Sequence, residues 1–149
     1  MARKPPTGLS RLMFRAPIWL YRAHLGGLLG GRFILLHHIG RTSGLPREAV
    51  VEVVAQPGEC FVICSGFGTQ SQWYRNVVAR PDIDITTRNR RIRVHARELT
   101  TQQAEEQMAD YTRRHPRAAK RLADYMGFSG PDASARVAAE LPFLELCPR

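Results

Sequence analysis

The residue types best suited to chemistry lie in the segment 40–47, between two predicted strands. It contains two arginines, two hydroxyl residues and two glycines: Gly40, Arg41, Thr42, Ser43, Gly44 and Arg47. The arginines offer forked cationic donors that match phosphate or carboxylate oxygens. The glycines let the backbone approach a ligand, and successive N–H groups in such a turn form an anion-binding concavity. The segment therefore predicts an anion site, although a plain hairpin turn would need only the glycines.

A second candidate site lies where a strand ends at Ser65-Gly66 and a helix begins near Ser71. The first turn of a helix presents free N–H groups and a positive dipole end, which suit an anion or an electron-rich ring. Trp73 and Tyr74 follow at once and have the shape to enclose a flat heterocycle. The alternative is a core tryptophan on a helix that Ser71 merely caps.

The elements that must position these residues follow from hydrophobic periodicity. Strands are expected at 32–39, 47–56, 59–65, 82–87, 90–99 and 142–147. Helices are expected at 71–80, at 100 or 101 to 114, at 116–126 and at 133–140. Adjacent antiparallel strands with helices outside them predict an α+β fold, and a small closed or split barrel of about six strands removes the exposed sheet edges.

The N-terminal part has a different character. Residues 1–8 are polar and proline-containing, which predicts a loose arm before a single domain of residues 9–149. Residues 9–29 carry apolar side chains at helical spacing with three arginines on the other side, which predicts an amphipathic helix. Such a helix packs on its own domain or lies on an anionic membrane surface, and the sequence leaves both open.

Composition restricts the partners. The 22 Lys and Arg residues exceed the 13 Asp and Glu residues, which gives a net charge of +9 and favours an anionic partner. We find no nucleic-acid-binding motif, no signal peptide and no run long enough to span a membrane, so a cytoplasmic protein is expected, with the inner face of the membrane left open. The odd number of cysteines, three, favours buried free thiols in a reducing compartment.

The remaining charged residues carry weaker predictions. His37 and His38 lie on one predicted strand, so one must face inward and the other outward, and no further ligands at metal spacing accompany them. No metal site is therefore expected. The arginines of segments 88–97 and 113–121 form two further basic clusters, which are interpreted either as solvated faces or as a surface for an extended acidic tail.

The two candidate sites together resemble the deazaflavin-dependent nitroreductase family of actinobacteria. The resemblance is carried by Gly-Arg-Thr-Ser-Gly-Leu-Pro-Arg at 40–47, Ser-Gly at 65–66 and Trp-Tyr-Arg-Asn at 73–76, and it extends over nearly the whole chain. It implies a split β-barrel and the reduced cofactor coenzyme F-420, an 8-hydroxy-5-deazaflavin with a phosphate and a glutamyl tail. It also implies hydride transfer to a quinone, a nitroaromatic compound or a similar small electrophile.

The resemblance also assigns residues. It implies that Arg41, Thr42, Ser43, Gly44 and Arg47 meet the phosphate and tail, with Pro46 beside them. The ring would be bordered by Ser65, Gly66, Trp73 and Tyr74, with Asn76 completing the set. Split barrels of this kind often pair, which makes a homodimer an expectation.

The catalytic assignments are less direct. No serine–histidine–acid arrangement is evident, which agrees with a cofactor that performs the chemistry while the protein orients it. Tyr74 and Tyr125 are the candidate proton donors, and solvent is the alternative. The tyrosine-rich stretch of some family members is reduced here to Tyr111 and Tyr125. Relatives of this broad fold bind flavin mononucleotide (FMN), so FMN is the alternative cofactor, and a non-catalytic flavin-, deazaflavin- or lipid-binding protein is the alternative function.

Overall fold

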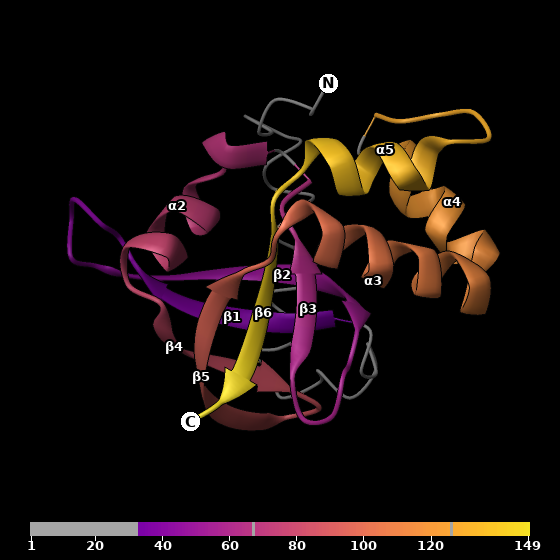
Figure 1. The fold of residues 1–149 in the computed structure, drawn as a ribbon. Helices are drawn as coiled ribbons and strands as arrows, with labels where there is room; N and C mark the ends of the chain where they lie inside the picture. Colours follow the sequence, from indigo (N-terminus) through magenta and orange to yellow (C-terminus); the bar gives the residue numbers. More distant parts are fainter. Residues whose placement is uncertain (1–32, 67, 126) are drawn as a thin grey trace.

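The strands form a closed barrel. The computed structural model describes residues 33–66, 68–125 and 127–149, without the side chain of Tyr125. Its strands are β1 (Phe33–Ile39), β2 (Pro46–Ala55), β3 (Phe61–Cys64), β4 (Asp82–Thr87), β5 (Arg90–Glu98) and β6 (Phe143–Pro148). They join in the order β1-β2-β3-β6-β5-β4, every pair antiparallel (Figure 1). The predicted α+β barrel of six strands is confirmed.

Alternation of side chains along the strands explains the closure. In β4, Ile83 and Ile85 are buried inside the barrel, while Asp82 and Asp84 face outward. A closed barrel lets every strand pair on both edges, so no edge is left to aggregate. The β4–β5 hairpin turns at Arg88 and Asn89, both with positive φ (49° and 67°), as two-residue hairpin turns require.

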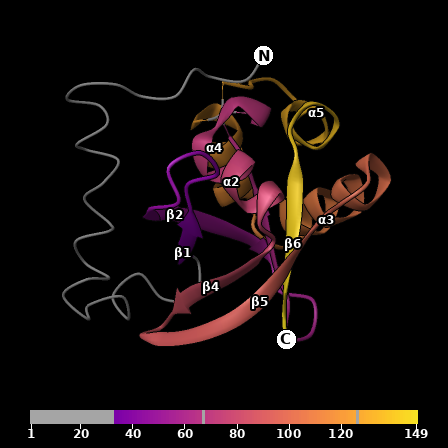
Figure 2. The same ribbon diagram turned by 90° about the vertical axis from the view of Figure 1, so that its left-hand side faces the viewer.

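The helices lie on two sides of the barrel (Figures 1 and 2). They are η2 (Gly68–Gln70), α2 (Gln72–Ala79), α3 (Thr101–Arg114), α4 (Pro116–Tyr125) and α5 (Ala133–Glu140). Helices α3 to α5 pack over β2, β3 and β6. Together with the outward side chains of these strands, such as Val54, Val62 and Phe143, they form a second core. Helix α2 instead buries Tyr74 and Val77 in the core of the barrel.

Local sequence sets where helix α3 begins. The side chain of Thr100 accepts a hydrogen bond from the backbone N–H of Gln103, and the backbone N–H of Thr100 donates to the Gln103 side chain. This reciprocal capping box satisfies two donors that a helix start otherwise leaves free. It confirms Thr100 rather than Thr101 as the cap.

The cysteines overturn one prediction. Cys60, which precedes β3, forms a disulfide with Cys147 in β6, 87 residues later in the chain. The expectation of three free thiols is wrong for these two, because the antiparallel pairing of the neighbouring strands β3 and β6 brings them side by side. Cys64 is the free, buried thiol, as expected. Four residues along a strand separate Cys60 from Cys64 by roughly 13 Å, too far for a bridge between them, but spacing along the chain carries no information about Cys147.

The predicted arm, 1–8, and the predicted amphipathic helix, 9–29, lie outside the described residues. The packing and membrane alternatives for that helix therefore stay predictions. In the described part of the chain, no helix is both long and apolar enough to cross a membrane.

Candidate functional site

The turn between β1 and β2 is closed by its own hydrogen bonds. The N–H of Gly40 donates to the carbonyl of Leu45 at 2.9 Å, and the N–H of Gly44 donates to the carbonyl of Gly40 at 2.8 Å. The Ser43 hydroxyl accepts from the N–H of Leu45 at 3.2 Å. A Cβ on residue 40 would lie 2.3 Å from that hydroxyl oxygen, and Gly44 has a φ of +71°, so both glycines are needed by the turn itself.

The donors that remain suit an anion. Among the described residues, no partner satisfies the backbone N–H groups of Thr42 and Ser43 or the guanidinium of Arg47, and all three residues are exposed. Two successive amides, a threonine hydroxyl and a forked cation at the base of β2 form a donor set that phosphate or carboxylate oxygens match. The residues present therefore fit the phosphate-bearing end of a deazaflavin. Pro46 starts β2 opposite Ile39 and is exposed.

Asn76 ties this turn to helix α2. Its Oδ1 accepts from the backbone N–H of Arg41 at 3.1 Å and from the Arg41 guanidinium at 2.8 Å. Its Nδ2 lies 3.1 Å from Nδ1 of His38. The backbone N–H and the guanidinium of Arg41 are both donors, so the atom of the Asn76 amide that they contact must be the oxygen. The Asn76 amide nitrogen therefore donates to His38. Asn76 is 5% exposed, and we interpret it as the residue that positions the turn.

His38 is consequently an uncharged acceptor. Its Nδ1 receives the Asn76 proton, so its own proton lies on Nε2. Burial, followed by the nearby Arg47 charge, lowers the pKa of His38 from 6.5 to about 4. The sequence predicted that one of the two histidines faces inward, and the structure shows that it is His38, which is 4% exposed.

Acidification is expected to weaken the fold through His38. Above pH 6.5, His38 is neutral in both the folded and the unfolded protein. Below pH 6.5, His38 of the unfolded chain gains a proton, whereas His38 of the folded chain takes up that proton only near pH 4. The free energy of unfolding is therefore expected to fall by roughly 2 kcal/mol from pH 6.5 to pH 4. Urea unfolding across this range measures the loss.

The His38→Gln variant is the matched comparison, and it is expected to lose most of that pH dependence. His37 remains as a smaller contributor, since burial also lowers its pKa. The carboxylates whose pKa is lowered by arginine or histidine partners, such as Asp84, lose their stabilising contribution only at more acidic pH, where they become protonated. A variant with the full wild-type pH dependence would contradict the assignment.

The loop after β3 keeps its own polar groups occupied. The Ser65 hydroxyl donates to the carbonyl of Gly68 at 2.7 Å, and the N–H of Gly68 donates back to the carbonyl of Ser65 at 3.0 Å. Ser65 is 1% exposed, whereas Gly66 is half-buried. Ser65 thus shapes the loop that leads into α2, and Gly66 is the more accessible member of the pair. Ser71 precedes α2, but its side chain makes no capping hydrogen bond.

The aromatic pair of α2 divides its roles. Trp73 is half-buried against the barrel core, and its ring meets that of Tyr74 edge-on, with centroids 6.2 Å apart. The Tyr74 hydroxyl donates a short hydrogen bond to the Glu98 carboxylate. Burial and then this carboxylate raise the pKa of Tyr74 to about 12. Sequence reasoning did not single out Glu98, because only the fold brings the end of β5 to α2.

The other candidate tyrosines lie on the α3–α4 side. Tyr125 is the last residue of α4, and its side chain lies outside the described part of the structure. Tyr111 is buried in α3 and donates to the carboxylate of Glu52 at 3.1 Å. Tyr74 comes from α2, on the other side of the barrel, so the structure does not bring Tyr74 and Tyr111 into one cluster.

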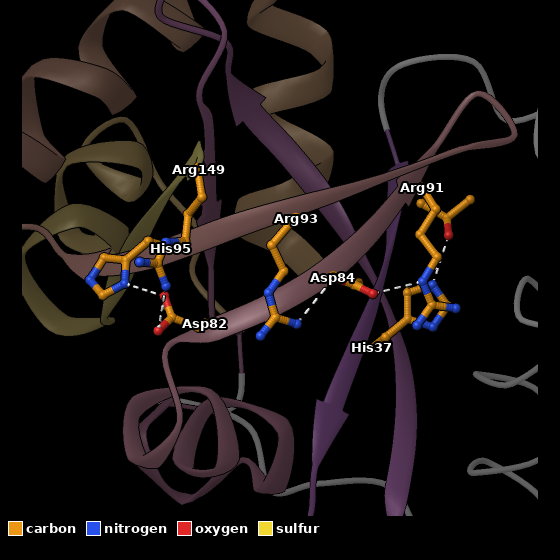
Figure 3. Close-up of polar contacts among 8 residues, drawn as sticks. His37, Asp82, Asp84, Arg91, Arg93, His95 and Arg149 are labelled. Carbon is orange, nitrogen blue, oxygen red and sulfur yellow. Dashed lines mark hydrogen bonds and ion pairs between the residues drawn. The ribbon is translucent and has the colours of Figure 1, made fainter.

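The basic cluster of segment 88–97 is mostly paired on the outside of the barrel (Figure 3). Arg91 and Arg93 both bind Asp84, at 2.9 and 3.2 Å. His95 and Arg149 both bind Asp82, at 2.7 and 2.8 Å. Exposed pairs of this kind contribute little stability each. They occupy the donors of these arginines and offset part of the positive charge, which favours the solvated-face interpretation over a surface for an acidic tail.

Comparison with known proteins decides the family. A family model described as F420H2-dependent quinone reductase matches residues 13–127, well over half of the chain. The chain belongs to this family. It is accordingly a deazaflavin-dependent oxidoreductase, and the family, the enzyme class and coenzyme F-420 are confirmed as predicted from the paired motifs.

Solved structures share the fold of this F420H2-dependent family member. One, described as an F420-H2 dependent reductase, is 18% identical with a TM-score of 0.53, over 77% of this chain and 93% of that chain. Another, described as a domain-swapped dimer, is 18% identical with a TM-score of 0.55, over 88% and 99%. A pyridoxamine 5'-phosphate oxidase-related FMN binding protein from Nostoc punctiforme PCC 73102 is 14% identical with a TM-score of 0.56, over 97% and 83%.

Proposed function

We propose that this oxidoreductase holds reduced coenzyme F-420 at the 40–47 turn and transfers its hydride to a quinone. The observation that carries the proposal is the pair of amides at Thr42 and Ser43, which have no partner among the described residues, in the same turn as the exposed Arg47. When bound, the cofactor supplies the hydride, and the protein binds and orients it.

Each residue has a distinct task in this proposal. Thr42, Ser43 and Arg47 bind the phosphate and the acidic tail, and Gly40 and Gly44 allow the turn that presents them. The Arg41 guanidinium has further N–H donors available for the cofactor, because its hydrogen bond to Asn76 uses one nitrogen. The ring would lie toward Gly66 and Trp73, near the start of α2, the helix whose Asn76 contacts the turn.

Removing either arginine of the turn is expected to weaken cofactor binding. Arg47→Ala and Arg41→Ala should each cost about 1.5–3 kcal/mol of binding free energy, the range for a hydrogen bond to a charged group. Titration of the reduced cofactor, followed by absorbance or fluorescence, gives the dissociation constants. Arg80→Ala, at an exposed arginine on the C-terminal end of α2, is the matched control and should leave affinity unchanged. Equal affinities for all three variants would refute a cofactor site at the turn.

Tyr74 stays a candidate proton donor, and the Glu98 contact bears on it. A phenol whose proton is committed to a carboxylate, with a pKa near 12, is a weak acid at neutral pH. We expect Tyr74→Phe to lose about 1–2 kcal/mol of stability from the broken hydrogen bond, with little change in kcat. A fall in kcat of about 100-fold or more would instead make Tyr74 the donor. Tyr125→Phe tests the second candidate in the same assay.

Two alternatives are separated by direct measurement. Titration with coenzyme F-420 against FMN decides the cofactor, and tight F-420 binding without oxidation by any quinone or nitro compound would favour a non-catalytic binder.

A homodimer is proposed because a similar fold is described as a domain-swapped dimer. Light scattering of the purified protein tests it.

A further inference from the structure

A second basic site lies away from the turn. A cavity of about 610 Å³ opens between the end of β2 and the junction of α3 and α4. The described residues of its wall include no aspartate or glutamate, but they do include a histidine and four arginines: His115, Arg88, Arg114, Arg117 and Arg121. The volume is within the range of small-molecule sites, about 300–1,000 Å³.

The charges on this wall differ from those on the outer face of the barrel. There, Arg91 and Arg93 both bind the Asp84 carboxylate (Figure 3). Within the described residues, by contrast, no hydrogen bond or ion pair engages the guanidinium groups of Arg88, Arg117 or Arg121. Arg114 has Asp110 as its partner, at 3.2 Å. Three guanidinium groups from a hairpin tip and a helix therefore share one hollow without a counter-charge.

The wall is also partly apolar. Val53 and Ala55 from β2 and Pro116 and Ala118 from the start of α4 contribute to it. The Tyr111 and His115 rings, 5.7 Å apart at their centroids and tilted by 52° to each other, add aromatic surface. Arginine forks match carboxylate and phosphate oxygens, while the apolar part suits a compact organic body.

This cavity is separate from the turn. The turn precedes Pro46 and the cavity begins at Val53, close to the far end of the ten-residue strand β2. At a rise of about 3.3 Å per residue, Arg47 and Val53 are roughly 20 Å apart along β2. A ligand group held by Thr42 and Arg47 does not reach Arg117 unless it is very long.

We propose that the cavity binds an organic anion with two or more carboxylate or phosphate groups on a small apolar body. The site is independent of the cofactor proposal, and it uses Arg88, Arg117 and Arg121 as its anion-binding residues. Such an anion comes either as a free polyacid or as the acidic tail of a larger ligand.

Calorimetric titration of the full chain with benzene-1,3,5-tricarboxylate tests the site. We expect saturable binding, weakened about tenfold or more by Arg117→Gln or by Arg121→Gln, since each removes a charge-assisted hydrogen bond. Lys120→Gln is the matched control, because it removes the same charge from an exposed position of the same helix outside the cavity, and its affinity should stay within about twofold of wild type. Thermal unfolding of each variant verifies the fold.

Titrations with further ligands show which kind of anion the site prefers and which results would contradict the proposal. Tighter binding of triglutamate than of the tricarboxylate, with the same arginine dependence, would support an acidic tail, and weaker binding would support a free polyacid. Pyrophosphate should bind more weakly than either, because it lacks the apolar body. Four results would overturn the proposal. The first is no saturable binding of the tricarboxylate, and the second is an equal loss of affinity in Lys120→Gln and Arg117→Gln. The third is an equal loss of affinity in Arg41→Ala, and the fourth is preferential binding of a single-stranded oligonucleotide. Loss of F-420 binding in Arg41→Ala with tricarboxylate binding intact keeps the two proposals distinct.

Discussion

Reduction of the Cys60–Cys147 disulfide is expected to lower the free energy of unfolding by about 2–5 kcal/mol. The bridge connects residues 87 positions apart, so it removes much of the conformational freedom of the unfolded chain. It also joins Cys60, just before β3, to the last strand, β6, at the point where the barrel closes. Urea unfolding with and without a thiol reductant measures the difference.

The double variant Cys60→Ser, Cys147→Ser is the control for this experiment. Its stability should match that of the reduced wild type and should not respond to the reductant. Thiol titration under denaturing conditions should detect one thiol, Cys64, before reduction and all three cysteines after it. In the folded protein Cys64 should react slowly, because its burial raises the pKa of the thiol. Three thiols without a reductant would contradict the bridge.

Asn76→Ala is expected to lose about 2–4 kcal/mol of stability and to weaken cofactor binding at the same time. The substitution leaves buried His38 without its donor and the backbone N–H of Arg41 without its acceptor. An unsatisfied buried polar group costs its full desolvation, which exceeds the value of the hydrogen bond itself. The turn would also lose its connection to α2, so its donors would no longer be held in place.

Val78→Ala, at an exposed position of the same helix, is the control and should change stability by less than about 0.5 kcal/mol. Asn76→Asp is the informative second variant. It keeps an oxygen for Arg41, but it sets a carboxylate against His38 and should therefore raise the pKa of that histidine. Wild-type stability in Asn76→Ala would show that the contacts of Asn76 are dispensable.

The functional residues were only partly predictable. The turn residues were predicted as a cofactor site from their types, because glycine, arginine and hydroxyl residues at short spacing act locally, and that role stays a prediction. Asn76 was selected as a cofactor residue, whereas its contacts are with Arg41 and His38. That role depends on a pairing between positions 38 residues apart, and nothing in local spacing reports it.

By itself, the sequence determined the order and the approximate limits of the strands and helices, because alternation and helical spacing are local properties. Through the paired motifs it also determined the family, and it predicted an anion site at the 40–47 turn. The tertiary structure alone decided that Cys60 meets Cys147, that Glu98 meets Tyr74 and that three arginines share a cavity. The physical reason is that strand register and barrel closure arise from packing of the whole chain, and they bring together residues whose separation along the chain carries no signal.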